Sequence, residues 1–154
     1  MTQQLAILLH LLSAVIWVGG MFFAYMALRP AAGQLEPPIR LTLWVAVFQR
    51  FFPWVWGAII ILPLSGYFLA WSSYPNMASL PLYINLMQFM GWAMILIYLH
   101  VYFASFKRLK VAVTEQNWPE GGKRLGQIRL LIGLNLLLGL CLLGVVAVGR
   151  YGLF

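Results

Sequence analysis

The sequence has few acidic residues and almost no cysteine. Its 154 residues include three Asp or Glu and a single Cys, Cys141, which lies within an apolar run. One thiol excludes an intrachain disulfide and a CxxC metal motif, and so few carboxylates leave no pair for acid–base catalysis. The sequence also has no nucleophile–base pair and no glycine-rich phosphate-binding loop. Hydrolase and nucleotide-hydrolysing functions therefore have no support from the residues.

Charged residues of either sign are scarce, and long apolar runs take their place. The charged fraction is 8% and the hydrophobic fraction 63%, whereas soluble domains have about 25% charged and about 45–50% apolar residues. A helix needs about 20 apolar residues to cross the hydrocarbon core. Four runs are long enough, over about residues 5–28, 41–71, 83–106 and 125–148. We therefore predict an all-α integral membrane protein in which residues 1–154 form one bundle of four transmembrane helices.

The positive charges are placed unevenly along the chain, which has a formal net charge of +7. No positive charge lies in the second loop. Those that flank the first and third loops are Arg29, Arg40, Lys107, Arg108, Lys110, Lys123 and Arg124. Because cytoplasmic loops carry the excess of Lys and Arg, we expect both termini on the periplasmic side of a bacterial inner membrane. The lipid bilayer accounts for these cations, so we expect no nucleic-acid partner.

The only two histidines, His10 and His100, both lie inside predicted spans. With a rise of about 1.5 Å per residue, His10 lies roughly 9 Å from the bilayer centre toward the outside and His100 roughly 8 Å toward the cytoplasm. Two axial imidazoles must reach one iron, so an offset of roughly 16 Å disfavours a shared bis-histidine haem. Two separate sites, or one site and one structural histidine, fit these depths better.

A stripe of methionines lies in the half of the third span that is expected at the depth of His10. Met87, Met90 and Met94 are three and four residues apart, so they share one helix face. Imidazole with thioether is a soft ligand set that suits Cu(I), and a His/Met pair also ligates haem. We predict a metal site at His10 and these methionines, whereas the alternative is that the methionines only fill a helix seam. Three further side chains are expected beside the ligands: Trp17, Asn85 and Gln88.

The residues expected near the depth of His100 include two arginines. Arg50 lies near the start of the apolar part of the second span and Arg129 in the first turns of the fourth, and no acidic residue lies within any span. The two arginines either snorkel to the interface or meet an anionic group such as a lipid phosphate or the propionates of haem b. In the second case His100 and Met21 would be the axial ligands.

The fourth span is the most uniformly apolar of the four. Asn135 lies in its middle and is expected to form an interhelical hydrogen bond that supports the site. Gly133, Gly139 and Gly144 suit close helix contact. We therefore expect this helix to pack tightly against its neighbours.

Three stretches resemble the membrane domain of the copper resistance protein D (CopD) family. They are LLHLLSAVIWVGGMFF, RFFPWVWGAIIILPLSGYFLAW and IRLLIGLNLLLGLCLLGVVAVG, and in the last of these Asn135 stands where an acidic residue is common. The resemblance implies an inner-membrane protein of copper uptake or resistance, with His10 as the residue most directly carried over.

The layout of the two histidines also resembles the HemJ-type protoporphyrinogen oxidase family, which is linked to b-type haem. One histidine lies early in the first span and the other late in the third, in LHVYFASF. That family carries a lysine early in its third helix, where this sequence has Gln88 and Phe89. This second resemblance implies a bound tetrapyrrole.

Three functional hypotheses follow. The first is a copper-handling protein with an intramembrane His/Met site for Cu(I), and the second is a haem- or porphyrin-binding electron carrier or oxidase. The third is a structural or assembly subunit, so enzymatic activity is left open. Four helices give few walls to a deep site, so a homodimer is a further hypothesis. A periplasmic metal or redox partner is another.

Overall fold

The computed structural model describes residues 1–150, except for the side chain of Met77, and that part of the chain is helical apart from its connections. Four helical stretches are long and apolar enough to cross a membrane: Thr2–Ala32, Pro37–Ser73, Leu82–Thr114 and Trp118–Arg150. The predicted all-α class and the expected four helices of membrane-spanning length and apolarity are confirmed. Each stretch is longer than its predicted span, because the helices continue into segments that are less apolar.

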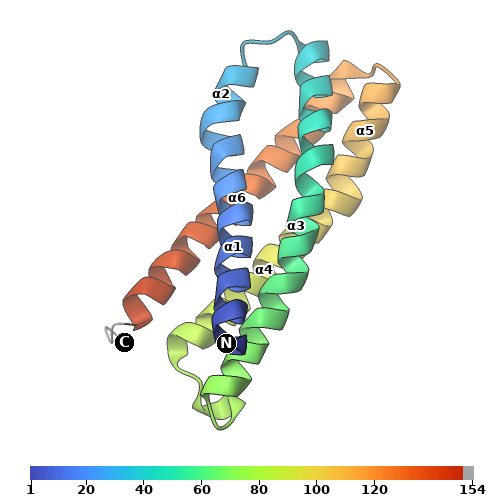
Figure 1. Cartoon of the computed structure of the whole chain (residues 1–154). Coiled ribbons are helices and arrows are strands. Elements are labelled where there is room, and N and C mark those ends of the chain that lie inside the picture. Colours follow the sequence, from blue (N-terminus) through green and yellow to red (C-terminus); the bar gives the residue numbers. More distant parts are fainter. Residues whose placement is uncertain (151–154) are drawn as a thin grey trace.

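The first stretch comprises α1 (Thr2–Phe23), the π-helical segment η1 (Ala24–Leu28) and α2 (Arg29–Ala32). The second is one helix, α3 (Pro37–Ser73), which continues through both of its internal prolines (Figure 1). A short 3-10 turn, η2 (Met77–Ser79), precedes the third stretch, which comprises α4 (Leu82–His100), the π-helical η3 (Val101–Phe106) and α5 (Lys107–Thr114). The fourth stretch is α6 (Trp118–Arg150).

The third connection is a helical hairpin and not the long cationic loop that the sequence predicted. Helix α5 continues the third span, and only residues 115–117 separate it from α6. Leu109 and Ala112 are buried on α5, which packs against α6, while the lysines and arginines of this segment stay on its surface. Burial of one apolar face therefore keeps the segment helical beyond the apolar span. Gln116 completes the turn with a positive φ of 55°.

The helices pack as two pairs, α1 with α3 and α4 with α6. Close contact at two of the predicted glycines of α6 is confirmed, since an added Cβ would lie 3.0 Å from Tyr25 at Gly133 and 3.0 Å from Val18 at Gly139. Gly144 has no such neighbour within 4 Å. It lies about 140° around the helix from Gly139 and faces away from the packed side.

One half of the space between the two pairs is filled by an aromatic cluster. Its members come from α3 and from α4 with η3: Trp44, Phe48, Phe52, Trp56, Tyr98, Tyr102 and Phe106. Phe52 lies at its centre, with its ring centroid 4.9 Å from that of Phe106 and its carbonyl accepting a 3.2 Å hydrogen bond from the Tyr98 hydroxyl. These large rings pack the half of the bundle nearest α5. The other half contains a cavity.

Candidate functional site: a cavity between the helix pairs

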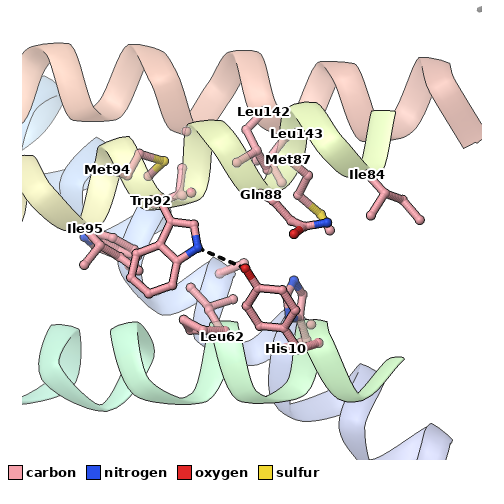
Figure 2. A pocket seen from close by; sticks show the side chains of 18 of the residues that line it. His10, Leu62, Ile84, Met87, Gln88, Trp92, Met94, Ile95, Leu142 and Leu143 are labelled. Atoms are coloured by element: carbon pink, nitrogen blue, oxygen red, sulfur yellow. Dashed lines mark hydrogen bonds between the residues drawn. The ribbon is translucent and has the colours of Figure 1, made fainter. Parts of the chain in front are cut away.

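A cavity of about 120 Å³ lies between the two helix pairs, near the end where α3 finishes and α4 begins. All four spans line it. His10 and Trp17 come from α1, Leu62 and Gly66 from α3, and Gly139 from α6. Figure 2 shows His10 and, across from it, Met87 and Gln88 of α4 directed into the space between the helices. We call this space the His10 cavity.

The His10 ring is held by a serine of the neighbouring helix. Its Nδ1 lies 2.9 Å from Ser65 Oγ, and Ser65 Oγ lies 2.6 Å from the carbonyl oxygen of Ile61 one turn earlier. A hydroxyl has one proton, and the short contact assigns that proton to the Ile61 carbonyl. Ser65 therefore accepts the Nδ1–H of His10, which leaves Nε2 as the nitrogen with a free lone pair. The hydrogen bond thus selects the tautomer whose metal-binding lone pair lies on Nε2.

The next residue on α3 brings the backbone close to the imidazole. An added Cβ on Gly66 would lie 3.3 Å from His10 Cε1, so a larger side chain would displace the ring. Sequence reasoning did not single out Ser65, although a hydroxyl beside a glycine in an apolar run was a usable signal. It also missed the 3.1 Å hydrogen bond from Trp92 Nε1 to the Tyr67 hydroxyl, which joins α4 to α3 at the wall of the cavity.

Two of the three methionines in the predicted stripe reach the cavity. Met87 and Met94 line it, together with Gln88. Met90 is half-buried outside it, because the other lining positions of α4 are 84, 88, 91, 92 and 95, which lie on the opposite side of Met87 from Met90. Asn85 also lies outside the cavity. Its side chain is exposed and donates a 3.2 Å hydrogen bond to the carbonyl of Leu80.

His100 and Met21 are not brought together. The His100 side chain is exposed on the surface of the bundle, whereas Met21 is buried and lines a second, smaller cavity of about 20 Å³ to which His100 does not contribute. Along α4, His100 lies twelve residues after Gln88, which is about 18 Å at the helical rise. The structure therefore keeps the two histidines far apart, as their estimated depths predicted.

Asn135 lines the second cavity. Its side-chain carbonyl does not form the interhelical hydrogen bond that the sequence predicted. Its side chain is 3% exposed, and Oδ1 has no hydrogen-bond partner within residues 1–150. Trp17 lines both cavities and separates them. A volume of about 20 Å³ is enough for one water molecule, which would satisfy the buried oxygen.

Arg50 and Arg129 lie in different surroundings, which does not support the alternative in which both meet one anionic group. Arg50 is exposed, and its guanidinium donates a 3.4 Å hydrogen bond to the carbonyl of Ala46 on its own helix. Arg129 is half-buried, with its guanidinium 6.0 Å from the ring centroid of Trp44. The positive charges of Arg29 and Arg40 act on its guanidinium.

The nitrogen and sulfur donors that line the His10 cavity are one imidazole and two thioethers, beside the neutral oxygens of Gln88 and Tyr67. In the described part of the chain, no group of three or more His, Cys, Asp or Glu side chains is placed to hold a metal ion. Within residues 1–150, no carboxylate or thiolate lines the cavity. Imidazole and thioether are soft ligands of the kind that suit Cu(I).

These features define a helical multi-pass membrane protein, embedded in lipid, with a small His/Met-lined cavity in one half of its bundle. A comparison with models of protein families matches residues 45–149 to copper resistance protein D. The matched segment is more than half of the chain, which therefore belongs to the copper resistance protein D (CopD) family and has a connection with copper. The match begins within α3, so α1 and His10 lie outside it. Searches of the curated proteins and of the solved structures give no match.

Proposed function

We propose that this chain handles copper by binding Cu(I) in the His10 cavity, with His10 Nε2 and the Met87 sulfur as ligands. The observation that carries the proposal is that an imidazole with a fixed tautomer and a thioether, from α1 and α4, line one cavity. Family membership supports copper as the cargo. Soft, uncharged ligands in an apolar setting favour Cu(I) over divalent ions that take oxygen ligands.

The size of the cavity favours an ion over a tetrapyrrole. Sites for drug-sized ligands have volumes of about 300 Å³ or more, whereas the His10 cavity has about 120 Å³. The separation of His10 from His100 also argues against one haem held by both. The resemblance to the HemJ-type family stays a prediction, as do the homodimer and the periplasmic partner.

Met94 provides a second thioether deeper in the bundle. It lies seven residues after Met87 on the same face of α4, or about 10 Å further along the helix. With the orientation expected from the positive charges, the His10 cavity lies in the periplasmic half of an inner membrane. In this proposal Cu(I) enters from the periplasm and moves from His10 and Met87 toward Met94. The aromatic cluster blocks further passage until the helix pairs move apart.

The direct test is a competition titration of the purified full-length chain with a coloured Cu(I) chelator. The proposal expects one Cu(I) bound per chain and no Soret band when haem is offered. A chain that leaves all the Cu(I) with the chelator would refute it. A Soret band after haem addition would support the haem alternative, and a chain that binds neither would support a structural subunit.

The two methionines closest to the depth of His10 allow a matched comparison. Met87→Leu removes a sulfur that faces the cavity and is expected to weaken Cu(I) binding roughly tenfold or more. Met90→Leu removes a sulfur outside the cavity and is expected to leave the affinity unchanged, because both substitutions conserve volume. Equal losses in the two variants would show that the cavity does not select the ligand.

The serine that holds His10 provides a second comparison. Ser65→Ala removes the acceptor of Nδ1–H, so the ring is free to turn and to change tautomer. We expect Cu(I) affinity to fall about tenfold, as for other hydrogen-bond partners of metal-binding histidines. Ser72→Ala removes an exposed hydroxyl that bonds only to a carbonyl of the same helix, and it serves as the control in the same titration. An unchanged affinity in Ser65→Ala would rule out this role for Ser65.

A further inference from the structure

Three arginines from three segments converge at the end of the bundle opposite the His10 cavity. Arg29 begins α2, Arg40 lies in the first turn of α3, and Arg129 lies on α6. The positive charges of Arg29 and Arg40 both act on that of Arg129. Tyr25 connects the segments, because the Arg29 guanidinium lies 4.7 Å from its ring centroid and its hydroxyl packs against Gly133, one turn after Arg129. We call these three side chains the arginine cluster.

Among residues 1–150, no carboxylate forms an ion pair with the arginine cluster. The chain has three acidic residues, Glu36, Glu115 and Glu120. Glu120 pairs with Arg124 at 2.6 Å, and this is the one ion pair among residues 1–150. Glu36 and Glu115 are exposed at the ends of helices α3 and α5. The three guanidinium groups at this end of the bundle therefore have no carboxylate partner in the described part of the chain.

Buried donors without acceptors lie at the same place. Nε of Arg40, Nε of Arg129 and Nε1 of Trp44 are all buried without a hydrogen-bond partner in the described chain. The Trp44 side chain is 3% exposed and lies beneath the Arg129 guanidinium. Buried N–H groups are nearly always paired in folded proteins. An anionic group with several acceptor oxygens would satisfy these donors.

The surroundings indicate an anion that carries acyl chains. Next to the arginines, three apolar side chains are exposed on the outer surface of the helices: Met26 at 58%, Ile39 at 59% and Leu130 at 66%. Met26 lies one turn before Arg29, while Ile39 and Leu130 adjoin Arg40 and Arg129 in sequence. Guanidinium groups bind phosphate oxygens in a bidentate manner. A phospholipid would present its phosphate to the arginines and its chains to the exposed apolar side chains.

We propose that Arg29, Arg40 and Arg129 form a binding site for the phosphate of an anionic phospholipid, with Trp44 as the floor of the site. The site is independent of copper binding, since it lies at the opposite end of the bundle from His10. Basic pockets between transmembrane helices are a known way to recognise anionic headgroups. A lipid bound here would hold η1 with α2, the start of α3 and the middle of α6 together.

The test titrates the purified full-length chain in detergent with cardiolipin, and follows both the thermal unfolding midpoint and the lipid retained in native mass spectrometry. We expect cardiolipin to raise the midpoint of the wild type. Arg129→Gln and Arg40→Gln should each weaken lipid binding about tenfold, because each removes charge-assisted hydrogen bonds. Arg50→Gln removes the same charge from the exposed surface of α3 and should bind as the wild type does.

Control ligands distinguish the source of the phosphate. Phosphatidylcholine, which has no net charge, should give no shift, and inorganic phosphate should neither raise the midpoint nor displace cardiolipin. Stabilisation by inorganic phosphate alone would overturn the lipid assignment. An equal loss of cardiolipin binding in Arg50→Gln would overturn the specific site, because it would show only general attraction between charges. If Arg129→Gln does not fold, Arg40→Gln and Arg29→Gln decide the question by the same criterion.

Discussion

His10→Ala is expected to abolish tight Cu(I) binding by the purified chain. The substitution removes the only imidazole that lines the cavity between the helix pairs and leaves thioethers alone at the site. Loss of a partner behind a metal-binding histidine already costs about 10–100-fold in affinity, so loss of the histidine itself should exceed about 100-fold. The measurement is a competition titration against a Cu(I) chelator at constant pH.

His100→Ala is the matched control for this loss. His100 is the other intramembrane histidine, but its side chain is exposed and lines neither cavity. We expect its replacement to leave Cu(I) affinity within error of the wild type. If the two variants lost affinity to the same extent, the single-histidine site would be wrong. If only His100→Ala did, the ligand assignment would move to the other end of α4.

Phe52→Ala is expected to cause the largest loss of stability from a single substitution. The Phe52 ring packs against Phe48, Tyr98, Tyr102 and Phe106, and its side chain is 3% exposed. Truncating such a residue leaves a cavity that the surrounding rings cannot fill, at a cost of about 3–5 kcal/mol in the free energy of unfolding. Thermal or denaturant unfolding of the chain in a fixed detergent measures the change.

Phe89→Ala makes the same chemical change on the outside of the bundle. Phe89 is 76% exposed and faces the surrounding lipid or detergent, so its truncation leaves no internal cavity. We expect its unfolding midpoint to stay close to that of the wild type. Equal destabilisation of the two variants would mean that the aromatic cluster does not hold the two helix pairs together.

Part of the candidate site was predictable from the sequence and part was not. The partnership of His10 with the first half of the third span followed from helical rise, because residues at equal depth in a bundle are neighbours. Which methionine meets His10 did not follow. Met87 and Met90 share one broad face of the helix, and only the rotation of α4 against α3 and α6 turns Met87 inward and Met90 outward.

The surroundings of Arg129 also could not be predicted from its depth in the membrane. The sequence placed it at the depth of Arg50, and the two were expected either to snorkel to the interface or to meet an anionic group. In the structure Arg50 points away from the bundle, while the turn between α2 and α3 brings Arg29 and Arg40 to Arg129. Depth along a helix is a local property, whereas direction around it depends on the neighbouring helices.

By itself the sequence determined the number of apolar helices long enough to span a membrane and the soft side chains expected at the level of His10. These properties depend on the length and polarity of contiguous segments, because those two quantities decide which segments are stable in the bilayer. The tertiary structure alone decided the hydrogen bond from His10 to Ser65, the choice of Met87 and the convergence of the three arginines. Each of these depends on how helices distant in sequence rotate and pack against one another, because side-chain contacts between helices are set by packing and not by hydrophobic length.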